Sequence, residues 1–217
     1  MTKFFIIGLP RTGTTSVSVA LLEQGLKVAH QAFTKQAFEL ADVISDAPCF
    51  SDYMHLDYVY SNAKFIYLDR SLEAWVPSMQ MLLSRMLVHL DEKTGRFHPV
   101  LKRSFKHTFA VGEVSEPADS QHLIHCYQAH KKHVFDFLCD RDNFISLDIS
   151  EVGALSKLLN FMNIEEKFNL ELTRLNFPHL NRGRHVASWD EYKHPNKINA
   201  NAAGPEKRKF FDYKLVN

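Results

Sequence analysis

The most informative stretch of the sequence is a turn near its N-terminus that contains two glycines. The apolar run at residues 4–7 leads into Gly8-Leu9-Pro10-Arg11-Thr12-Gly13-Thr14-Thr15-Ser16. A buried strand that breaks at such a turn and continues as a helix points successive backbone N–H groups and the positive helix end at one anion. The sequence therefore predicts a phosphate-binding loop at residues 8–16.

The loop lacks the lysine that nucleoside triphosphates require. The spacing from Gly8 to Gly13 is that of a P-loop, but Thr14 occupies the position of the P-loop lysine, and Arg11 is the only cation of the loop. An enzyme that acts on a nucleoside triphosphate normally places that lysine on the β- and γ-phosphates. We therefore expect this loop to bind a different anion.

Two segments together resemble the sulfotransferase family. The string from Pro10 to Thr15 resembles the 5′-phosphosulfate loop of that family, and its Pro-Arg-Thr-Gly-Thr-Thr form looks closest to a small bacterial branch. Residues 64–70 form an apolar stretch that ends in Arg70, and Ser78 follows eight positions later, which resembles the family's 3′-phosphate motif. Residues 143–149 and the amphipathic stretch 155–161 are similar to a late strand and helix of the same family.

The resemblance implies a donor and a set of residues that bind it. The donor is 3′-phosphoadenosine-5′-phosphosulfate (PAPS), and no metal is implied. Arg11 would bridge the sulfonate and the 5′-phosphate, because a planar guanidinium can bind two oxygens at once. The 5′-phosphate would be held by the backbone N–H groups of Thr12, Gly13, Thr14 and Thr15, together with the hydroxyls of Thr14, Thr15 and Ser16. Arg70 and Ser78 would bind the 3′-phosphate.

Two residues compete for the role of general base. In the family the base often ends the strand before the 3′-phosphate strand, two residues ahead of a proline, and that position here is Asp46, before Pro48. A carboxylate needs partial burial to act as a base near neutral pH. His30 ends a neighbouring predicted strand and titrates near neutral pH unaided. Asp52 is a third option, but it is better placed to cap a helix.

Two other functions share this scaffold. In a nucleotide or small-metabolite kinase, Asp69 would end a Walker-B strand and bind magnesium. The missing lysine and the arginine beside Asp69 argue against that, so we expect Asp69 to form a salt bridge or a cap. The second alternative is a nucleotide-binding protein without catalysis. The pairs His122/His125 and His130/His133 have metal-ligand spacing but no completing ligand, so we expect a solvated or acceptor-lining face.

Composition narrows the class of protein further. The chain has 217 residues, 45% of them hydrophobic, which suits one domain over residues 1–217 that becomes mostly irregular from about residue 177. No run of about 20 apolar residues occurs, and the three cysteines lack CxxC spacing, so we expect a cytoplasmic protein with reduced core thiols. A net charge of +1 gives no reason to expect nucleic acid as a partner.

The acceptor is not specified by any motif. It would be a small molecule or a glycan that presents a hydroxyl or an amine, and its pocket should be shaped by residues 85–133 and the C-terminal tail. In many sulfotransferases a late basic segment closes over the 3′-phosphate. That pattern is not intact here, and Arg184 or Arg208 would be the nearest equivalents.

Strands and helices that alternate must position these groups. Apolar periodicity predicts strands at 3–8, 26–30, 42–45, 64–69 and 144–147, and helices at 14–24, 33–40, 52–60, 72–90, 100–110, 119–138 and 151–162. Ser71 is expected to cap the helix that follows it. This order predicts an α/β fold with three layers (α/β/α) around a parallel sheet, like that of P-loop NTPases. Ligands of such sheets bind at the carboxyl ends of the strands, where residues 8–16 and Asp46 fall.

Overall fold

A parallel sheet forms the centre of the protein. The computed structural model describes residues 2–164, 177, 181–182, 185–186 and 189–203. Within them, five parallel strands lie in the order β2-β3-β1-β4-β5. These strands are β1 (Phe4–Ile6), β2 (Val28–His30), β3 (Val43–Ser45), β4 (Lys64–Asp69) and β5 (Phe144–Asp148). The predicted α/β fold class is therefore confirmed.

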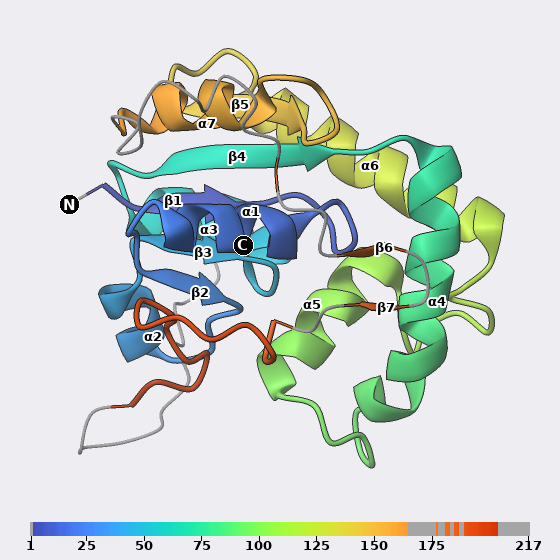
Figure 1. The fold of residues 1–217 in the computed structure, drawn as a ribbon. Coiled ribbons are helices and arrows are strands. Elements are labelled where there is room, and N and C mark those ends of the chain that lie inside the picture. The colour runs from blue at the N-terminus through green and yellow to red at the C-terminus, as the bar shows by residue number, and fades with distance from the viewer. Residues whose placement is uncertain (1, 165–176, 178–180, 183–184, 187–188, 204–217) are drawn as a thin grey trace.

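Helices cover both faces of the sheet, because the strands carry apolar side chains on both sides (Figure 1). Ile6 of β1 packs in one cluster with α1 (Thr14–Glu23) and α7 (Ala154–Met162). Its neighbour Phe5 points to the opposite face, as the two-residue period of a strand requires. There it packs with residues of α2 (Lys35–Leu40), α3 (Cys49–Val59) and α6 (Ser120–Leu138). The central strand β1 is therefore buried between helices on both faces of the sheet.

A third apolar cluster lies beyond the carboxyl ends of the strands. It joins α4 (Leu72–Leu90), α5 (Pro99–Phe109) and the first half of α6 around the fully buried Trp75. In Figure 1 the arrowheads of the strands point toward these green helices. The loops that leave β1, β3 and β4 therefore emerge between the sheet and a rigid helical wall.

The starts of α3 and α7, and the capping of α4, differ from the prediction. Helix α3 begins at Cys49, so Asp52 lies inside it and does not cap it. The Asp52 carboxylate is buried and accepts two hydrogen bonds from the Arg103 guanidinium, at 2.9 and 2.5 Å. Ser71 is the N-cap residue of α4, but its side chain makes no capping hydrogen bond. Helix α7 begins at Ala154, because Gly153 before it has a φ of 79°.

The C-terminal part of the chain returns to the edge of the sheet. The Val28 N–H donates to the Asn196 carbonyl at 3.0 Å, and the Ile198 N–H donates to the Val28 carbonyl at 2.9 Å. Residues 196–198 thus run alongside β2 and cover that edge of the sheet. A short antiparallel pair, β6 (Asn181–Arg182) and β7 (His185–Val186), precedes this segment. Hydrophobic periodicity gave no sign of either contact.

Two further expectations concern the helices and the thiols. Among the described residues, no helix is both long enough and apolar enough to span a membrane. Cys49 and Cys126 are buried free thiols, as expected for core residues, but Cys139 is exposed at the end of α6. The expectation of three core thiols was therefore wrong for Cys139.

Candidate active site

The loop between β1 and α1 makes close contacts that only glycine permits. A Cβ atom on Gly8 would lie 2.8 Å from the backbone nitrogen of Leu68 in β4, which is too close for any other residue. Gly13 precedes α1 with a φ of 107°, in the left-handed region that favours glycine. Between the two glycines, the Thr12 hydroxyl donates to the Leu9 carbonyl at 2.7 Å. The loop is therefore a tight turn pressed against β4.

Two side chains from distant elements fix the carbonyls of this loop. The indole N–H of Trp75, in α4, donates to the Pro10 carbonyl at 2.8 Å. The guanidinium of Arg70, directly after β4, donates to the Arg11 carbonyl at 2.6 Å. The two hydrogen bonds fix the direction of the loop carbonyls at Pro10 and Arg11. Trp75 itself is a fully buried core residue.

The first turn of α1 is open to an anion. Gly13 at the N-cap offers no side chain, and no side-chain hydrogen bond caps this helix. The first backbone N–H groups of a helix have no partner within it and carry a partial positive charge. Thr14 and Thr15 begin the helix and both line an adjoining cavity. Ser16, which was also expected to present its hydroxyl, is 5% exposed.

Arg11, Ser78 and Arg70 form one cluster beside the loop. The Arg11 Nε donates to the Ser78 hydroxyl at 2.9 Å, so the two predicted phosphate motifs meet at this point. Burial lowers the pKa of the Arg11 guanidinium, and the charges of Arg70 and Arg85 lower it further. Burial likewise lowers the pKa of Arg70. Partly buried cations held this close together attract a multivalent anion.

Asp69 serves a structural role at the end of β4. Its carboxylate accepts a hydrogen bond from the Tyr127 hydroxyl at 2.6 Å and forms an ion pair with Lys131. Burial acts to raise the pKa of Asp69, but the hydrogen bonds from Lys131 and Tyr127 outweigh it and lower that pKa. The Tyr127 hydroxyl also accepts from the Arg70 backbone N–H at 2.8 Å. This confirms the expected salt bridge, and it gives no support to a kinase-type magnesium ligand.

His30 and Asp46 meet at the ends of β2 and β3. The register pairs His30 with Ser45, which places Asp46 one residue beyond it. The His30 Nε2 lies 3.5 Å from the Asp46 carboxylate and 3.4 Å from the Thr15 hydroxyl. Burial lowers the pKa of His30, and the Asp46 charge partly opposes this. Both candidate bases thus stand next to the start of α1, with His30 favoured in its neutral form.

Buried serines hold the other side of the His30 ring. Its Nδ1 lies 2.8 Å from the Ser45 hydroxyl, which lies 2.8 Å from the Ser18 hydroxyl of α1. Both serines are fully buried. Asp46 is fixed differently, since its backbone has a φ of 61° and its carboxylate accepts from the Ala47 N–H at 2.7 Å. These contacts orient both side chains toward the loop.

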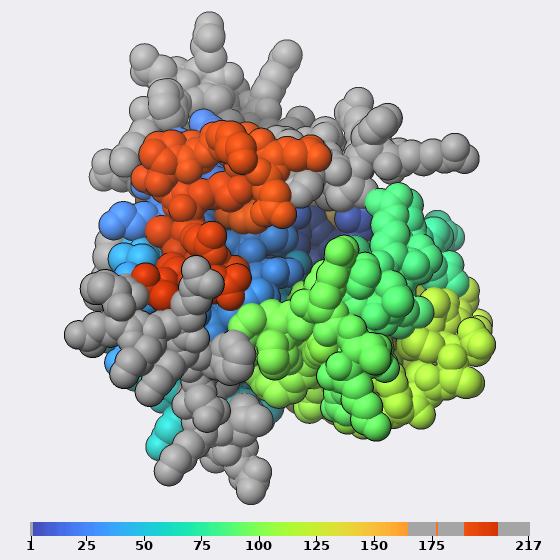
Figure 2. Space-filling view, turned by 90° about the horizontal axis from the view of Figure 1, so that it is seen from below, coloured from blue at the N-terminus to red at the C-terminus, as the bar shows by residue number. Residues whose placement is uncertain are grey.

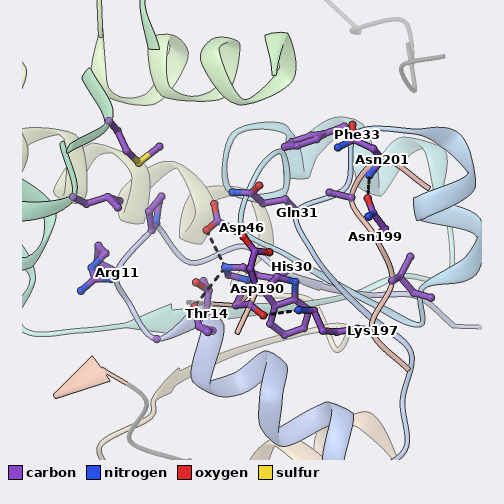
Figure 3. Close-up of a pocket in the computed structure, with 18 of the residues that line it drawn as sticks. Arg11, Thr14, His30, Gln31, Phe33, Asp46, Asp190, Lys197, Asn199 and Asn201 are labelled. Carbon is purple, nitrogen blue, oxygen red and sulfur yellow. Dashed lines mark hydrogen bonds and ion pairs between the residues drawn. The ribbon is translucent and has the colours of Figure 1, made fainter. Parts of the chain in front are cut away.

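A cavity of about 770 Å³ joins the loop to the two candidate bases. Figure 3 shows Thr14, His30 and Asp46 gathered in it, with Arg11 to one side and Asn199 on the other. Arg70 and Ser78 do not line this cavity, although both bond to Arg11, which does. Arg11 therefore belongs both to the basic cluster and to the cavity that contains the candidate bases.

The walls of the cavity differ in character. Leu82 and Met86 of α4 and Phe105 of α5 supply an apolar wall, and the last two fall within residues 85–133, the range expected to shape the acceptor pocket. The opposite wall comes from the segment after residue 188, through Trp189, Asp190, Lys193, Lys197, Asn199 and Asn201. In Figure 2 this red segment and the green helices border a hollow, and blue residues near the N-terminus are visible between them. No motif or periodicity marked that segment, apart from a tryptophan in a polar stretch.

The remaining candidates lie elsewhere. His122, His125, His130 and His133 line a separate cavity between α3, α5 and α6, away from the loop. Among the described residues, no group of three or more His, Cys, Asp or Glu side chains is arranged to hold a metal ion. Arg184 and Arg208 lie outside the described residues.

Comparison with known protein families identifies the family of this chain. A family model described as a sulfotransferase domain matches residues 29–186, which is most of the chain. The matched range contains His30, Asp46, Arg70 and Ser78, and it begins after the loop at residues 8–16. A search of curated proteins found no match.

Proposed function

The chain belongs to the sulfotransferase family, and from this we propose that it transfers the sulfonate of PAPS to a hydroxyl or an amine of an acceptor. The observation that carries the proposal is the contact between its two anion motifs. Arg11 of the loop bonds to Ser78, and Arg70 bonds to the Arg11 backbone. A donor with phosphates at both its 5′ and 3′ positions requires two such anion sites side by side.

The charged groups and hydrogen-bond donors of these residues suit the phosphates and the sulfonate of PAPS. The uncapped start of α1, with the Thr14 and Thr15 hydroxyls, would hold the 5′-phosphate. Arg70 and Ser78, which both bond to Arg11, would hold the 3′-phosphate. The sulfonate would then lie between Arg11 and the cavity of about 770 Å³, where an acceptor can approach it.

Positioning and electrostatics would supply most of the catalysis. The acceptor oxygen or nitrogen forms a bond to sulfur while the bond between sulfur and the bridging phosphate oxygen breaks. Arg11 and the N–H groups of α1 stabilise the negative charge that develops on the departing phosphate. The proton of the acceptor passes to the pair formed by His30 and Asp46, whose side chains are 3.5 Å apart.

The test is transfer of radiolabelled sulfonate from PAPS to a panel of phenols, alcohols, amines and sugars. We expect transfer to at least one class, and a loss of roughly 10²- to 10³-fold in kcat for Arg11→Ala, as for removal of one transition-state donor. Arg96→Ala is the matched control, because Arg96 is exposed between α4 and α5. Binding of nucleotide with no transfer to any acceptor would instead indicate a nucleotide-binding protein without catalysis.

A further inference from the structure

An aromatic residue from the C-terminal segment packs on the imidazole of His30. The centroids of the Trp189 and His30 rings are 5.3 Å apart, with 46° between the ring planes. The two residues are distant in sequence and meet only because the chain returns to this edge of the sheet. Trp189 also lines the cavity that contains Asp46. The indole therefore covers part of the imidazole at the point where an acceptor would enter.

Lys197 holds the tryptophan in place. Its ammonium group donates to the Trp189 carbonyl at 2.5 Å and to the Tyr192 carbonyl at 3.0 Å, and it lies 4.6 Å from the centroid of the Trp189 ring. One cation thus fixes both the backbone and the ring of the tryptophan.

The same lysine is attached to the strand that carries His30. Lys197 forms a parallel bridge with Val28, two residues before His30 in β2. The flanking hydrogen bonds from Val28 to Asn196 and from Ile198 to Val28 secure this attachment. His30 belongs to β2, and Trp189 is bound by a lysine whose backbone pairs with β2. Backbone hydrogen bonds to this strand therefore set the distance between Trp189 and His30.

We propose that Trp189, clamped by Lys197, is a positioning residue that excludes water from the His30 imidazole and keeps its Nε2 directed at Asp46 and Thr15. The proposal rests on the proposed function, because it assumes that His30 takes part in removing the acceptor proton. It assigns a role to a segment that no motif of the sequence marked.

The charges that face His30 decide the sign of the expected effect. Burial lowers the pKa of His30 below 6.5 and is the largest influence; Asp46 and Asp190 raise that pKa, and Lys197 lowers it. Ser45 and Thr15, the other polar contacts of the ring, are uncharged. Removal of Trp189 admits water, so the pKa of His30 rises toward 6.5. Because only neutral imidazole accepts a proton, the acid limb of the pH–rate profile moves to higher pH.

The experiment compares four variants with the parent protein: Trp189→Ala, Trp189→Phe, Lys197→Met and, as a control, Lys193→Met. Lys193 carries the same charge on the same segment, but it donates to the Asp190 carbonyl rather than to Trp189. The pKa of His30 is measured by NMR titration without substrates, with His30→Gln used to assign its signal. The pH dependence of kcat for sulfonate transfer is the second readout.

The proposal predicts a pattern among the four variants that loss of the donor site would not produce. Trp189→Ala and Lys197→Met raise the pKa of His30 and shift the acid limb of kcat upward by the same amount, whereas Trp189→Phe and Lys193→Met leave both near the parent values. Affinity for adenosine 3′,5′-bisphosphate stays unchanged in all four, which separates this effect from loss of the donor site. Lys197→Met also removes the charge of Lys197, which itself lowers the pKa of His30, so Trp189→Ala is the deciding variant. Should Trp189→Ala fail to fold, Trp189→Gln replaces it, because it removes the indole but keeps a longer side chain.

Two results would overturn the proposal. One is an unchanged His30 titration in Trp189→Ala, or in Trp189→Gln where that variant replaces it. The other is a shifted titration with an unmoved acid limb, which would make the packing merely structural. A parent protein that transfers no sulfonate at all would refute the proposed function instead, and the NMR titration would still decide whether Trp189 shields His30.

Discussion

The Arg70 guanidinium donates a hydrogen bond of 2.6 Å to the backbone carbonyl of Arg11, which ties the end of β4 to the loop after β1. These residues are 59 positions apart in the chain. Because β1 and β4 are parallel neighbours, their carboxyl ends meet at one edge of the sheet. The contact is therefore built into the sheet order, and it joins the two motifs that would recognise the two phosphates of the donor.

This contact shapes the expected effect of Arg70→Ala. Loss of a charge-assisted contact should weaken binding of adenosine 3′,5′-bisphosphate by about 2–4 kcal/mol. Binding of adenosine 5′-phosphosulfate, which lacks the 3′-phosphate, should weaken by no more than about 1 kcal/mol, through the lost bond to the loop. Isothermal titration calorimetry measures both affinities. Equal losses for the two ligands would mean that Arg70 only supports the loop.

Ser78→Ala tests the other contact of the cluster. It removes the acceptor of the Arg11 Nε, so we expect adenosine 3′,5′-bisphosphate to bind about 0.5–1.5 kcal/mol less tightly. Ser84→Ala is the matched control, since Ser84 lies on the same helix and its hydroxyl donates only locally, to the Met81 carbonyl. Identical affinities for the two variants would remove Ser78 from the donor site.

Asp46→Asn separates the two candidate bases. Loss of a general base should lower kcat by roughly 10²- to 10⁴-fold, while affinity for the nucleotide stays the same because Asp46 lies on the cavity side of the loop. The same assay is made on His30→Gln. A normal kcat for Asp46→Asn with a low kcat for His30→Gln would assign the base to His30 alone, and the reverse would assign it to Asp46.

Much of the fold followed from local patterns. The strand 64–69 was predicted with its observed bounds, because it is apolar throughout and flanked by polar residues. Helix starts were less predictable. Asp52 has the chemistry of a cap, but Arg103, which comes 51 positions later, pairs with it and draws it into the interior. Such a contact depends on how α5 packs on α3, and residue spacing along the chain carries no information about it.

Some residues of the candidate site could likewise be predicted from the sequence, and others could not. The loop, Arg70 and Ser78 could be predicted because the fixed spacing of short motifs marks them. The proximity of His30 and Asp46 followed from their positions at the ends of adjacent strands. Trp189 and Lys197 could not be found, because their place depends on a segment that pairs with β2 through backbone hydrogen bonds to Val28. Backbone pairing leaves little trace in side-chain periodicity.

We expect His130 to make the stability of the protein depend on pH. It is 8% exposed, its Nε2 donates to the Phe50 carbonyl at 2.7 Å, and burial lowers its pKa to about 4 from 6.5. Between these values the unfolded state binds more protons, so the free energy of unfolding should fall by about 2–3 kcal/mol from pH 7 to pH 4.5 on this account. Urea denaturation at both pH values measures the fall.

Two glutamine variants measure how much His130 contributes to the loss of stability between pH 7 and pH 4.5. His130→Gln removes the titrating group while keeping a donor for the Phe50 carbonyl, so the loss of stability between pH 7 and pH 4.5 should become smaller. His125→Gln, also on α6 and exposed, should retain the full loss. Parallel behaviour of the two variants would show that His130 does not govern the acid sensitivity.

Recognition of a nucleotide that carries both 5′ and 3′ phosphates is the central claim, and a thermal shift measurement tests it most directly. At 100 times its Kd, adenosine 3′,5′-bisphosphate should stabilise the protein by about 2.7 kcal/mol without magnesium. This corresponds to roughly 5–10 °C in Tm for a chain of this size. ATP with magnesium should shift Tm little, because the loop has Thr14 where a P-loop has lysine. A large shift with ATP and magnesium, and none with adenosine 3′,5′-bisphosphate, would contradict the account.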